Sequence, residues 1–268
     1  MSVLAAFMVP HPPLIVPDIG QGSERKVQKT IDSYERVARE IAELKPDTIV
    51  ISSPHVVMYY DGFHISSGRA YGDFSRFGAP QVSFSEEYDS ELVKEIEKIC
   101  DSEGLPASSK NGRDILLDHG TMVPLYFIRK AFKGGKIVRL GLSALPYETH
   151  YRLGEIVQTA ASNLNRRIVF VASGDLSHKL QEYGPYGFAK EGPEYDKRLM
   201  DVCSRADFGE LFNFDEDFCC DAAECGHRSF LIMAGVLDGM NVKATAYSHE
   251  DVTGVGYGIC SFFPKDRG

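Results

Sequence analysis

The sequence predicts an α/β protein: a single-domain α/β/α sandwich over residues 1–268 with a mostly parallel or mixed central sheet. Apolar runs of strand length alternate with longer amphipathic segments, as expected when strands and helices share one sheet. A length of 268 residues allows one domain or two. Because the chain has no internal repeat, no low-complexity tract and no convincing linker, one domain is the simplest interpretation.

The first apolar run, Val3–Val9, predicts a buried strand that Pro10 ends and His11 follows at once. Proline fixes its own φ and favours extended backbone in the residue before it, so the imidazole is held in a narrow set of directions. Ligands of parallel α/β proteins bind at the carboxyl ends of the strands. His11 is therefore a candidate binding residue, although taken alone it also fits an ordinary loop histidine.

A second strand follows after one helix. Apolar residues recur at helical spacing over residues 23–44, and the run Thr48–Ser53 then predicts a strand that again ends in proline and histidine, Pro54-His55. Two strands of one sheet that are joined through a helix lie parallel to each other. We therefore expect His11 and His55 to emerge at the same edge of the sheet.

The rest of the chain continues the alternation. Residues 14–20 predict a loop, and the glycine, serine and aromatic residues of 59–81 predict a hairpin or an excursion over the sheet. His119 precedes a helix that is expected to begin at Thr121, with Pro124 in its first turn. Further helices are expected at 88–100, 151–163, 194–206 and 221–237, and further strands at 136–143, 167–173, 243–248 and 256–263.

Composition and charge exclude several classes of partner. The net charge of −9 argues against nucleic acid or an anionic membrane, since both need a basic surface. The chain has no stretch near the roughly 20 apolar residues that span a bilayer, and its first residues lack the basic segment of a signal peptide. Six cysteines without a Cys-x-x-Cys pair argue against a zinc ribbon or a disulfide framework and favour a reducing cytoplasm.

Five residues form the candidate site, because each falls at the end of a predicted strand or the start of a predicted helix. Two imidazoles and one carboxylate on one face of an octahedral ion leave three positions open, as in non-haem Fe(II) oxygenases. A bidentate diol and dioxygen need those positions, and two further histidines can act as acid and base. The candidates are His11, His55, His119, His178 and Glu224.

Each candidate also has a structural explanation. Asp118 is placed to cap the helix that follows His119, and His178 fits a polar strand-to-helix turn. The spacing Asp221-x-x-Glu224 fits a capping box, in which the glutamate is purely structural. Taken singly, this capping interpretation of Glu224 is better than the ligand interpretation.

The other histidines and cysteines are expected to have no part in the site. His227 and His249 are interpreted as structural or peripheral, and His64 and His150 as surface residues. The spacing of the last cysteines along the chain matches no standard zinc pattern, so they are expected to be small core residues. These cysteines are Cys219, Cys220 and Cys225.

Five short stretches, spread over positions 10–237, form a set. They are Pro10-His11-Pro-Pro, Ser53-Pro-His55, Leu117-Asp-His119-Gly-Thr-Met-Val-Pro-Leu, Ser173-Gly-Asp-Leu-Ser-His178, and Glu224 ahead of Phe230-Leu-Ile-Met-Ala-Gly-Val-Leu. In this order they resemble the class III extradiol ring-cleaving dioxygenases, the family of the catalytic β subunit of protocatechuate 4,5-dioxygenase. Each stretch is weak alone, but the set is specific and covers most of the chain.

The resemblance implies a role for each candidate. It implies that His11, His55 and Glu224 bind iron, that His178 is the acid/base, and that His119 lines the pocket. The rival carboxylate for the third ligand position is Glu250, in Ser-His-Glu-Asp.

Part of the chain is more similar to one branch of this family. The stretch around His55 and the segment 72–78, Gly-Asp-Phe-Ser-Arg-Phe-Gly, resemble the Memo-like proteins, which need not be dioxygenases. Some members of that branch carry a second, fused domain, whereas we expect a single domain here. The walls of the pocket are expected to come from the loops 59–81 and 179–192.

Three functions follow as hypotheses. The first is an Fe(II)-dependent extradiol dioxygenase that takes a small catechol-like aromatic diol and O₂. The second keeps the fold and the metal site but assigns Memo-like binding or redox partnership without ring cleavage. The third is a hydrolase that uses Zn²⁺ and an activated water. The sequence leaves the diol unnamed and association into a homo-oligomer open.

Overall fold

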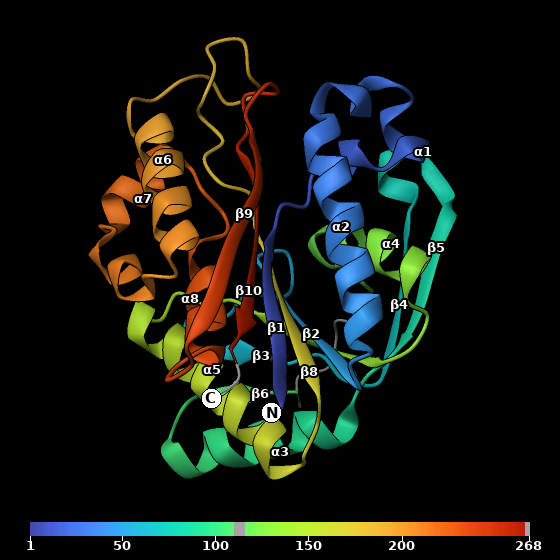
Figure 1. Cartoon of the computed structure of the whole chain (residues 1–268), viewed down its shortest axis with the longest axis vertical. Coiled ribbons are helices and arrows are strands. Elements are labelled where there is room, and N and C mark those ends of the chain that lie inside the picture. Colours follow the sequence, from blue (N-terminus) through green and yellow to red (C-terminus); the bar gives the residue numbers. More distant parts are fainter. Residues whose placement is uncertain (110–115, 266–268) are drawn as a thin grey trace.

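A computed structural model describes residues 1–109 and 116–265. Its centre is a six-stranded sheet in which four neighbouring strands are parallel and one runs antiparallel to both of its neighbours (Figure 1). The predicted α/β class with a mixed, mostly parallel sheet is thus confirmed. The strands lie in the order β7 (Lys136–Gly141), β2 (Thr48–Ser53), β8 (Ile168–Ser173), β1 (Val3–Val9), β10 (Tyr257–Pro264) and β9 (Val242–Glu250), with β10 the antiparallel one.

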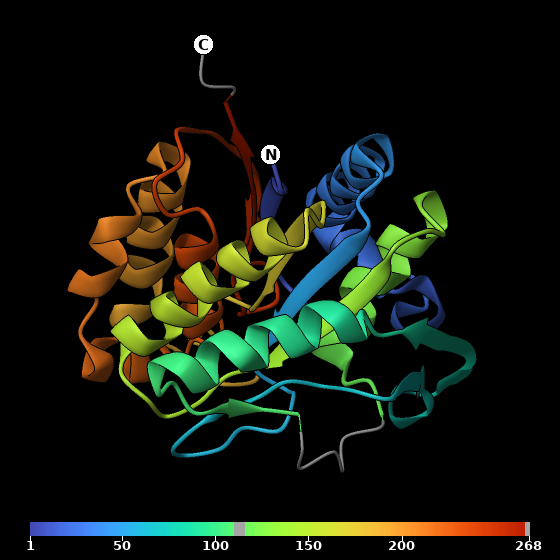
Figure 2. The ribbon, with the colours of Figure 1, turned by 90° about the horizontal axis from the view of Figure 1, so that it is seen from below.

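Both faces of the sheet are covered (Figures 1 and 2). On one face lie α3 (Ser90–Glu103), α5 (Tyr147–Asn163), α6 (Glu191–Arg205) and α8 (His227–Val236). On the other lie α2 (Gln28–Leu44), α4 (His119–Ala131) and the hairpin of β4 (Arg69–Phe74) and β5 (Ala79–Glu87). The smaller elements are β3 (Phe63–His64), β6 (Ala107–Ser108), α1 (Pro17–Gly20), α7 (Glu216–Ala222) and four 3₁₀ turns at Pro13–Ile15, Ser23–Val27, Ser75–Phe77 and Phe208–Asn213.

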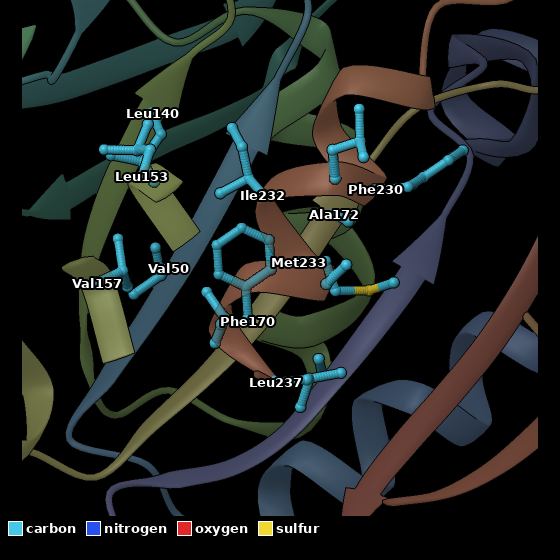
Figure 3. Close-up of a cluster of buried hydrophobic side chains, with 14 of the residues drawn as sticks. Val50, Leu140, Leu153, Val157, Phe170, Ala172, Phe230, Ile232, Met233 and Leu237 are labelled. Atoms are coloured by element: carbon cyan, nitrogen blue, oxygen red, sulfur yellow. The ribbon is translucent and has the colours of Figure 1, made fainter. Parts of the chain in front are cut away.

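Alternating side chains along each strand divide the core between the two faces. In β1, Ala6 and Met8 join one cluster, whereas Ala5 and Phe7 join the other. Figure 3 shows part of the first cluster, where side chains of the strands meet those of α5 and α8. Because both faces are covered, the parallel strands are apolar almost throughout. None of the helices in the two described stretches is long and apolar enough to cross a membrane.

The strands that precede His11 and His55 are parallel, as predicted, but they are not neighbours. Strand β8 lies between them and pairs with both, so that Val9 at the end of β1 is level with Ser173 at the end of β8. Ser52, near the end of β2, is level with Ala172 on the other side of β8. Three strands therefore deliver their last residues to one short stretch of the sheet edge.

Two segments near the amino terminus differ from the prediction. The expected loop at 14–20 contains a 3₁₀ turn, Pro13–Ile15, and one turn of α-helix, Pro17–Gly20. Both begin at proline, whose fixed φ suits the first position of a helix. The helix expected over 23–44 begins with the 3₁₀ turn Ser23–Val27 and becomes α-helical at Gln28.

Helix α4 begins two residues earlier than predicted. Asp118 is its N-cap and accepts hydrogen bonds from the N–H and the hydroxyl of Thr121, which makes His119 the first helical residue. Pro124 therefore lies in the second turn rather than the first. There it removes the N–H that the carbonyl of Gly120 normally receives in a helix.

The helix expected over 221–237 is interrupted. Helix α7 ends at Ala222, Ala223 adopts a left-handed conformation with φ of 53°, and α8 begins only at His227. The connecting loop lies very close to the end of β8. A Cβ on Gly174 would be only 2.2 Å from the Cα of Gly226. Only glycine at both positions allows this approach, which carries the loop to the edge of the sheet.

Candidate metal centre

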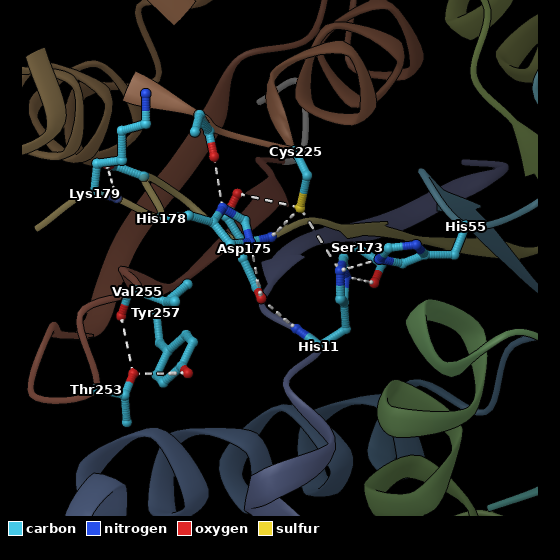
Figure 4. Close-up of polar contacts among 12 residues, drawn as sticks. His11, His55, Ser173, Asp175, His178, Lys179, Cys225, Thr253, Val255 and Tyr257 are labelled. Atoms are coloured by element: carbon cyan, nitrogen blue, oxygen red, sulfur yellow. Dashed lines mark hydrogen bonds and ion pairs between the residues drawn. The ribbon is translucent and has the colours of Figure 1, made fainter. Parts of the chain in front are cut away.

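The imidazoles of His11 and His55 meet at the carboxyl edge of the sheet. Their Nε2 atoms are 3.0 Å apart (Figure 4). His11 is 2% exposed, and its main-chain N–H donates to Oδ1 of Asp175 at 2.7 Å. The expectation that both histidines emerge at one edge is therefore confirmed.

His119 completes a group of three imidazoles. The ring of His119 lies 3.9 Å from that of His55 and 5.4 Å from that of His11, centroid to centroid. One nitrogen from each of the three lies within 4.8 Å of the other two, which is a spacing that allows a single metal ion to be held. His119 reaches this position because α4 begins with it.

Loss of hydration keeps the three imidazoles neutral, although His11 is buried, His119 half-buried and His55 exposed. Burial first, and then the charge of His55, lowers the pKa of His11 to about 3. Burial, followed by His55 and His11, lowers the pKa of His119 to about 4. Burial also lowers the pKa of His55, although Asp118 and Asp175 oppose the shift. Near neutral pH each ring therefore offers a nitrogen lone pair, which is what a metal ion requires of histidine.

The distance between the two facing nitrogens fits a metal ion. Two nitrogens that bind one ion at about 2.1 Å and at a right angle lie about 3.0 Å apart. The Nε2 atoms of His11 and His55 have this separation. The donor set of neutral imidazoles suits Fe²⁺, Zn²⁺ and other borderline ions, so the residues present fit a bound metal without selecting its identity.

A network behind the imidazoles holds the start of α4 against the sheet. Asp118 accepts from the hydroxyl of Ser53 at 2.7 Å and pairs with the buried Arg139 at 3.2 Å. Burial acts to raise the pKa of Asp118, but the charge of Arg139 and the hydrogen bonds from Ser53 and Thr121 together outweigh it and hold the pKa below its ordinary value. Gly120 allows the close approach, since a Cβ there would lie 2.3 Å from the Ser53 hydroxyl. The carboxylate thus stays ionised and fixes the direction of His119.

His178 lies beside this group and has its own orientation fixed. Its Nδ1 is 2.6 Å from the carbonyl oxygen of Ala223, which can accept a hydrogen bond but has no proton to donate. The proton of neutral His178 is therefore on Nδ1, and Nε2, 4.0 Å from Oδ2 of Asp175, carries the lone pair. Burial raises the pKa of Asp175, whereas His178 and the N–H of His11 oppose the shift. The general acid/base role of His178 stays a prediction.

The two candidate carboxylates point elsewhere. Oε2 of Glu224 accepts the N–H of His227 at 2.5 Å, at the start of α8, so the residue caps the helix that follows it. Glu250 accepts from both the N–H and the hydroxyl of Thr30 at 2.7 Å, near the start of α2. The ligand role of Glu224 stays a prediction, and it would require the carboxylate to leave the helix terminus. Burial raises the pKa of Glu224 to about 7.

Cys225 is a contact of the site that the sequence interpretation missed. Its Sγ lies 3.7 Å from Nε2 of His11 and 3.3 Å from the N–H of Asp175 (Figure 4). Of the other two cysteines expected in the core, Cys219 is buried but Cys220 is exposed. The loop that carries Cys225 has no strand or helix pattern, so periodicity gives no signal for its position.

Two histidines expected at the surface are buried. His150 is fully buried, with Nδ1 3.0 Å from the carbonyl of Pro146, and His64 is 1% exposed. Helix α5 begins at Tyr147, four residues before the expected start, and therefore includes His150 on its buried side. His227 is structural, as expected, and holds the carbonyl of Leu211 at 3.0 Å.

A cavity of about 880 Å³ opens beside His55 and His119. Its wall combines aromatic and apolar side chains with charged ones: Tyr71, Arg76, Phe77, Leu116 and Met122, together with the carboxylates of Asp73 and Asp118. The expected loop 59–81 supplies the first three, while the second expected loop places Tyr186 against His178, with ring centroids 5.1 Å apart. A groove of about 960 Å³ lies at the opposite end of the strands, but two of its cations, Arg129 and Lys136, are paired with glutamates.

Comparison with protein families gives one match. The family model described as the catalytic LigB subunit of aromatic ring-opening dioxygenase matches residues 5–260. The chain belongs to this family. The match covers all four histidines of the site and both glutamates considered for it.

Relatives within and around this family carry different names. A Clostridium acetobutylicum protein, CA_C1420, is 39% identical over 97% of this chain, which spans 57% of the relative's length. The 2-aminophenol 1,6-dioxygenase β subunit of a Pseudomonas species is 25% identical over 96% of this chain and 93% of its own. A MEMO1 family protein, MJ0403 of Methanocaldococcus jannaschii, is 26% identical over 70% of this chain and 61% of its own.

A solved structure supports the fold. The uncharacterized protein JW3007 of Escherichia coli K12 superimposes with a TM-score of 0.64 over 96% of this chain and 99% of its own. Its sequence identity is 15%, so the likeness concerns the architecture alone. The LigB family and the relationship to MEMO1 family proteins thus agree with the resemblance drawn from the short motifs.

Proposed function

We propose that the protein is a non-haem Fe(II)-dependent extradiol dioxygenase that opens the ring of a small catechol-like aromatic diol with O₂. The observation that carries the proposal is the group His11, His55 and His119, which can hold an ion beside a cavity with aromatic walls. Membership in a family named for ring opening supports the same reaction class. The proposed catalytic unit is one domain.

The metal site would be formed by the three imidazoles, and a bound Fe²⁺ would supply a centre that takes both the diol and O₂. The surrounding protein would keep these three rings neutral and directed toward one ion. Asp118 holds the start of α4 through Arg139, and Asp175 holds the main chain of His11. Burial of His11 excludes water from the side of the site that faces the core.

His178 is the proposed proton acceptor. Its Nδ1–H donates to the carbonyl of Ala223, which leaves Nε2 free to receive the proton of a substrate hydroxyl. Asp175, 4.0 Å from that nitrogen, would then pair with the imidazolium. A group that accepts the proton can return it to a later oxygen of the same reaction, as general acid/base catalysis requires.

The cavity can take a flat aromatic substrate that also carries polar groups. Phe77 packs edge-on against His119 with ring centroids 5.4 Å apart, so an aromatic ring in the cavity would meet other aromatic rings. The volume of about 880 Å³ is ample for a single-ring compound. Arg76 on the same wall gives the cavity a cationic group.

Two other functions are favoured by particular observations. Three histidines are also a donor set of catalytic zinc, which would produce a hydrolase through an activated water. Cys225, 3.7 Å from Nε2 of His11, adds a soft donor next to the site and favours metal binding without ring cleavage. Both alternatives keep the same histidines and differ in the ion and the reaction.

An oxygen-uptake experiment separates the three. Anaerobically purified protein would first be analysed for iron and zinc, then loaded with Fe²⁺ and offered catechol, protocatechuate, 3,4-dihydroxyphenylacetate and 2-aminophenol. The proposal requires O₂ consumption with a ring-opened product for at least one of them. Resorcinol is the matched control, because its two hydroxyls are not adjacent and cannot chelate one ion.

The alternatives give distinct results. Stoichiometric iron without O₂ consumption on any adjacent diol or aminophenol would replace the dioxygenase by a metal-binding protein. Zinc in the isolated protein together with zinc-dependent hydrolysis of an ester or amide would replace it by a hydrolase. In both cases His55→Ala is the control that ties the metal to this site.

A further inference from the structure

Ser173 links the imidazole of His11 to the main chain of helix α4. Its Oγ is 2.9 Å from Nδ1 of His11 and 2.6 Å from the carbonyl oxygen of Gly120 in α4. Ser173 is fully buried at the end of β8, level with Val9 of β1. A strand, a helix and a metal-site histidine therefore meet through a single hydroxyl.

The carbonyl of Gly120 is available because of Pro124. In an α-helix this oxygen would accept the N–H of the residue four positions later, and proline has none. A buried carbonyl without a partner costs free energy. Ser173 supplies the missing donor from the neighbouring strand, which explains why a proline is tolerated inside the buried helix α4.

The two distances determine where the protons lie. Two oxygens 2.6 Å apart repel unless a proton lies between them, and only the hydroxyl of Ser173 has one to give. Once that proton points at the carbonyl of Gly120, the oxygen of Ser173 can only accept from the imidazole. When His11 is neutral, its single ring proton must then be on Nδ1.

We propose that Ser173, with its proton held by the Gly120 carbonyl, is a positioning residue that fixes His11 as the Nδ1–H tautomer. The lone pair of His11 is then on Nε2, the atom that faces His55 and Cys225. The nitrogen of His11 that would bind the ion, Nε2, is thus already unprotonated in the metal-free protein. The role of this tautomer in metal binding rests on the proposed function, but the tautomer itself is a property of the metal-free protein.

The position of the His11 backbone does not depend on Ser173. The main-chain N–H of His11 donates separately to Asp175 at 2.7 Å. Removing the hydroxyl of Ser173 should therefore release the proton on the ring without moving the residue. This separation allows a test of the tautomer that a merely structural role would not affect.

The test is long-range ¹⁵N–¹H NMR of the histidine rings in metal-free protein at neutral pH, which reports the protonated nitrogen of His11. The wild type should show the Nδ1–H form. Ser173→Ala should convert a substantial part of His11 to the Nε2–H form. The matched control is Ser177→Ala, which removes another buried hydroxyl that donates to a carbonyl, that of Ala222 at 2.8 Å, and should leave His11 unchanged.

Pro124→Ala gives a second, independent variant. It restores an N–H that competes for the Gly120 carbonyl, so the hydroxyl of Ser173 can turn toward His11. The population of the Nδ1–H form of His11 should fall to a value between those of the wild type and Ser173→Ala, although this variant changes neither His11 nor Ser173. A population unchanged in Pro124→Ala would overturn the role assigned to the proline.

Metal affinity gives the second readout. Competition titration with Fe²⁺ under anaerobic conditions, and with Zn²⁺, should show an affinity about 10–100-fold lower in Ser173→Ala, the usual effect of losing a partner of a ligand histidine. Ser177→Ala should bind as the wild type does. An Nε2–H form in the wild type, or an unchanged ring in Ser173→Ala, would overturn the proposal. Failure of the oxygen-uptake test alone would remove the dioxygenase and leave this result standing.

Discussion

The Nε2 atoms of His11 and His55 face each other at 3.0 Å although 44 positions separate the two residues in the chain. Each follows a proline at the end of a parallel strand, and the two strands flank β8. In the metal-free protein a proton must lie between the two nitrogens, since bare lone pairs at this distance repel. A bound ion would take the place of that proton.

The first prediction concerns the metal. His55→Ala should reduce metal affinity by more than roughly 10–100-fold, which is the usual effect of losing a residue that hydrogen-bonds to a ligand, because this variant removes a ligand itself. The measurement is metal content after anaerobic loading and gel filtration. His249→Ala, at a half-exposed histidine that pairs with Asp196 at 2.6 Å, is the control and should retain the metal. Full metal content in His55→Ala would exclude this site.

The second prediction concerns His178. His178→Ala should keep most of the metal and lose turnover by about 10²–10⁴-fold, the usual contribution of a general acid/base. The reason is geometric, since Nε2 of His178 faces Asp175 and is not part of the group that converges on one ion. Turnover and metal content would be measured on the same preparation. A metal-free variant would instead make His178 a ligand.

The third prediction concerns Glu224. Because Oε2 caps α8 through the N–H of His227, Glu224→Ala should lower the free energy of unfolding by about 1 kcal/mol. Glu224→Gln keeps an acceptor of the same shape and should be nearly as stable as the wild type. Retention of the metal by both variants would leave the three imidazoles as its ligands. Sharp loss of iron from Glu224→Gln at unchanged stability would establish the carboxylate ligand that the family resemblance implies.

The fourth prediction concerns pH and the buried His150. Burial lowers its pKa to about 4, so below about pH 6.5 the unfolded chain binds a proton that the folded protein does not. Stability should therefore fall as pH falls from 6.5 toward 4, by up to about 1.4 kcal/mol per pH unit for this residue. Urea unfolding of metal-free protein would measure the slope. His150→Asn should be less stable at pH 7 but show a shallower slope, and an unchanged slope would contradict the pKa.

Much of the sheet could be predicted because local pattern and burial agree there. The run Val3–Val9 is apolar throughout, and Thr48–Ser53 has an apolar centre and is buried throughout, as expected of strands that are covered on both faces. The order of the strands could not be predicted in this way. The insertion of β8 between β1 and β2 depends on contacts with residues more than 100 positions away, and no local pattern reports them.

The site could be predicted only as far as the strand ends determine it. His11 and His55 follow from proline-ended strands, whereas the side-chain direction of Glu224 depends on a helix break that a left-handed Ala223 creates. Alanine carries no sequence signal for that conformation. The contact between Cys225 and His11 could not be predicted for the same reason, since Cys225 belongs to the same loop.

The central position of β8 has a consequence for synthesis of the protein. A nascent chain that has emerged as far as β7 already contains His11, His55 and His119, but it lacks the strand that pairs with both β1 and β2. Domains of this size fold through contacts that form only after distant segments have been made. Incomplete translation products would therefore carry the three histidines without the spacing that could hold an ion, and metal binding would require the central strand to be in place.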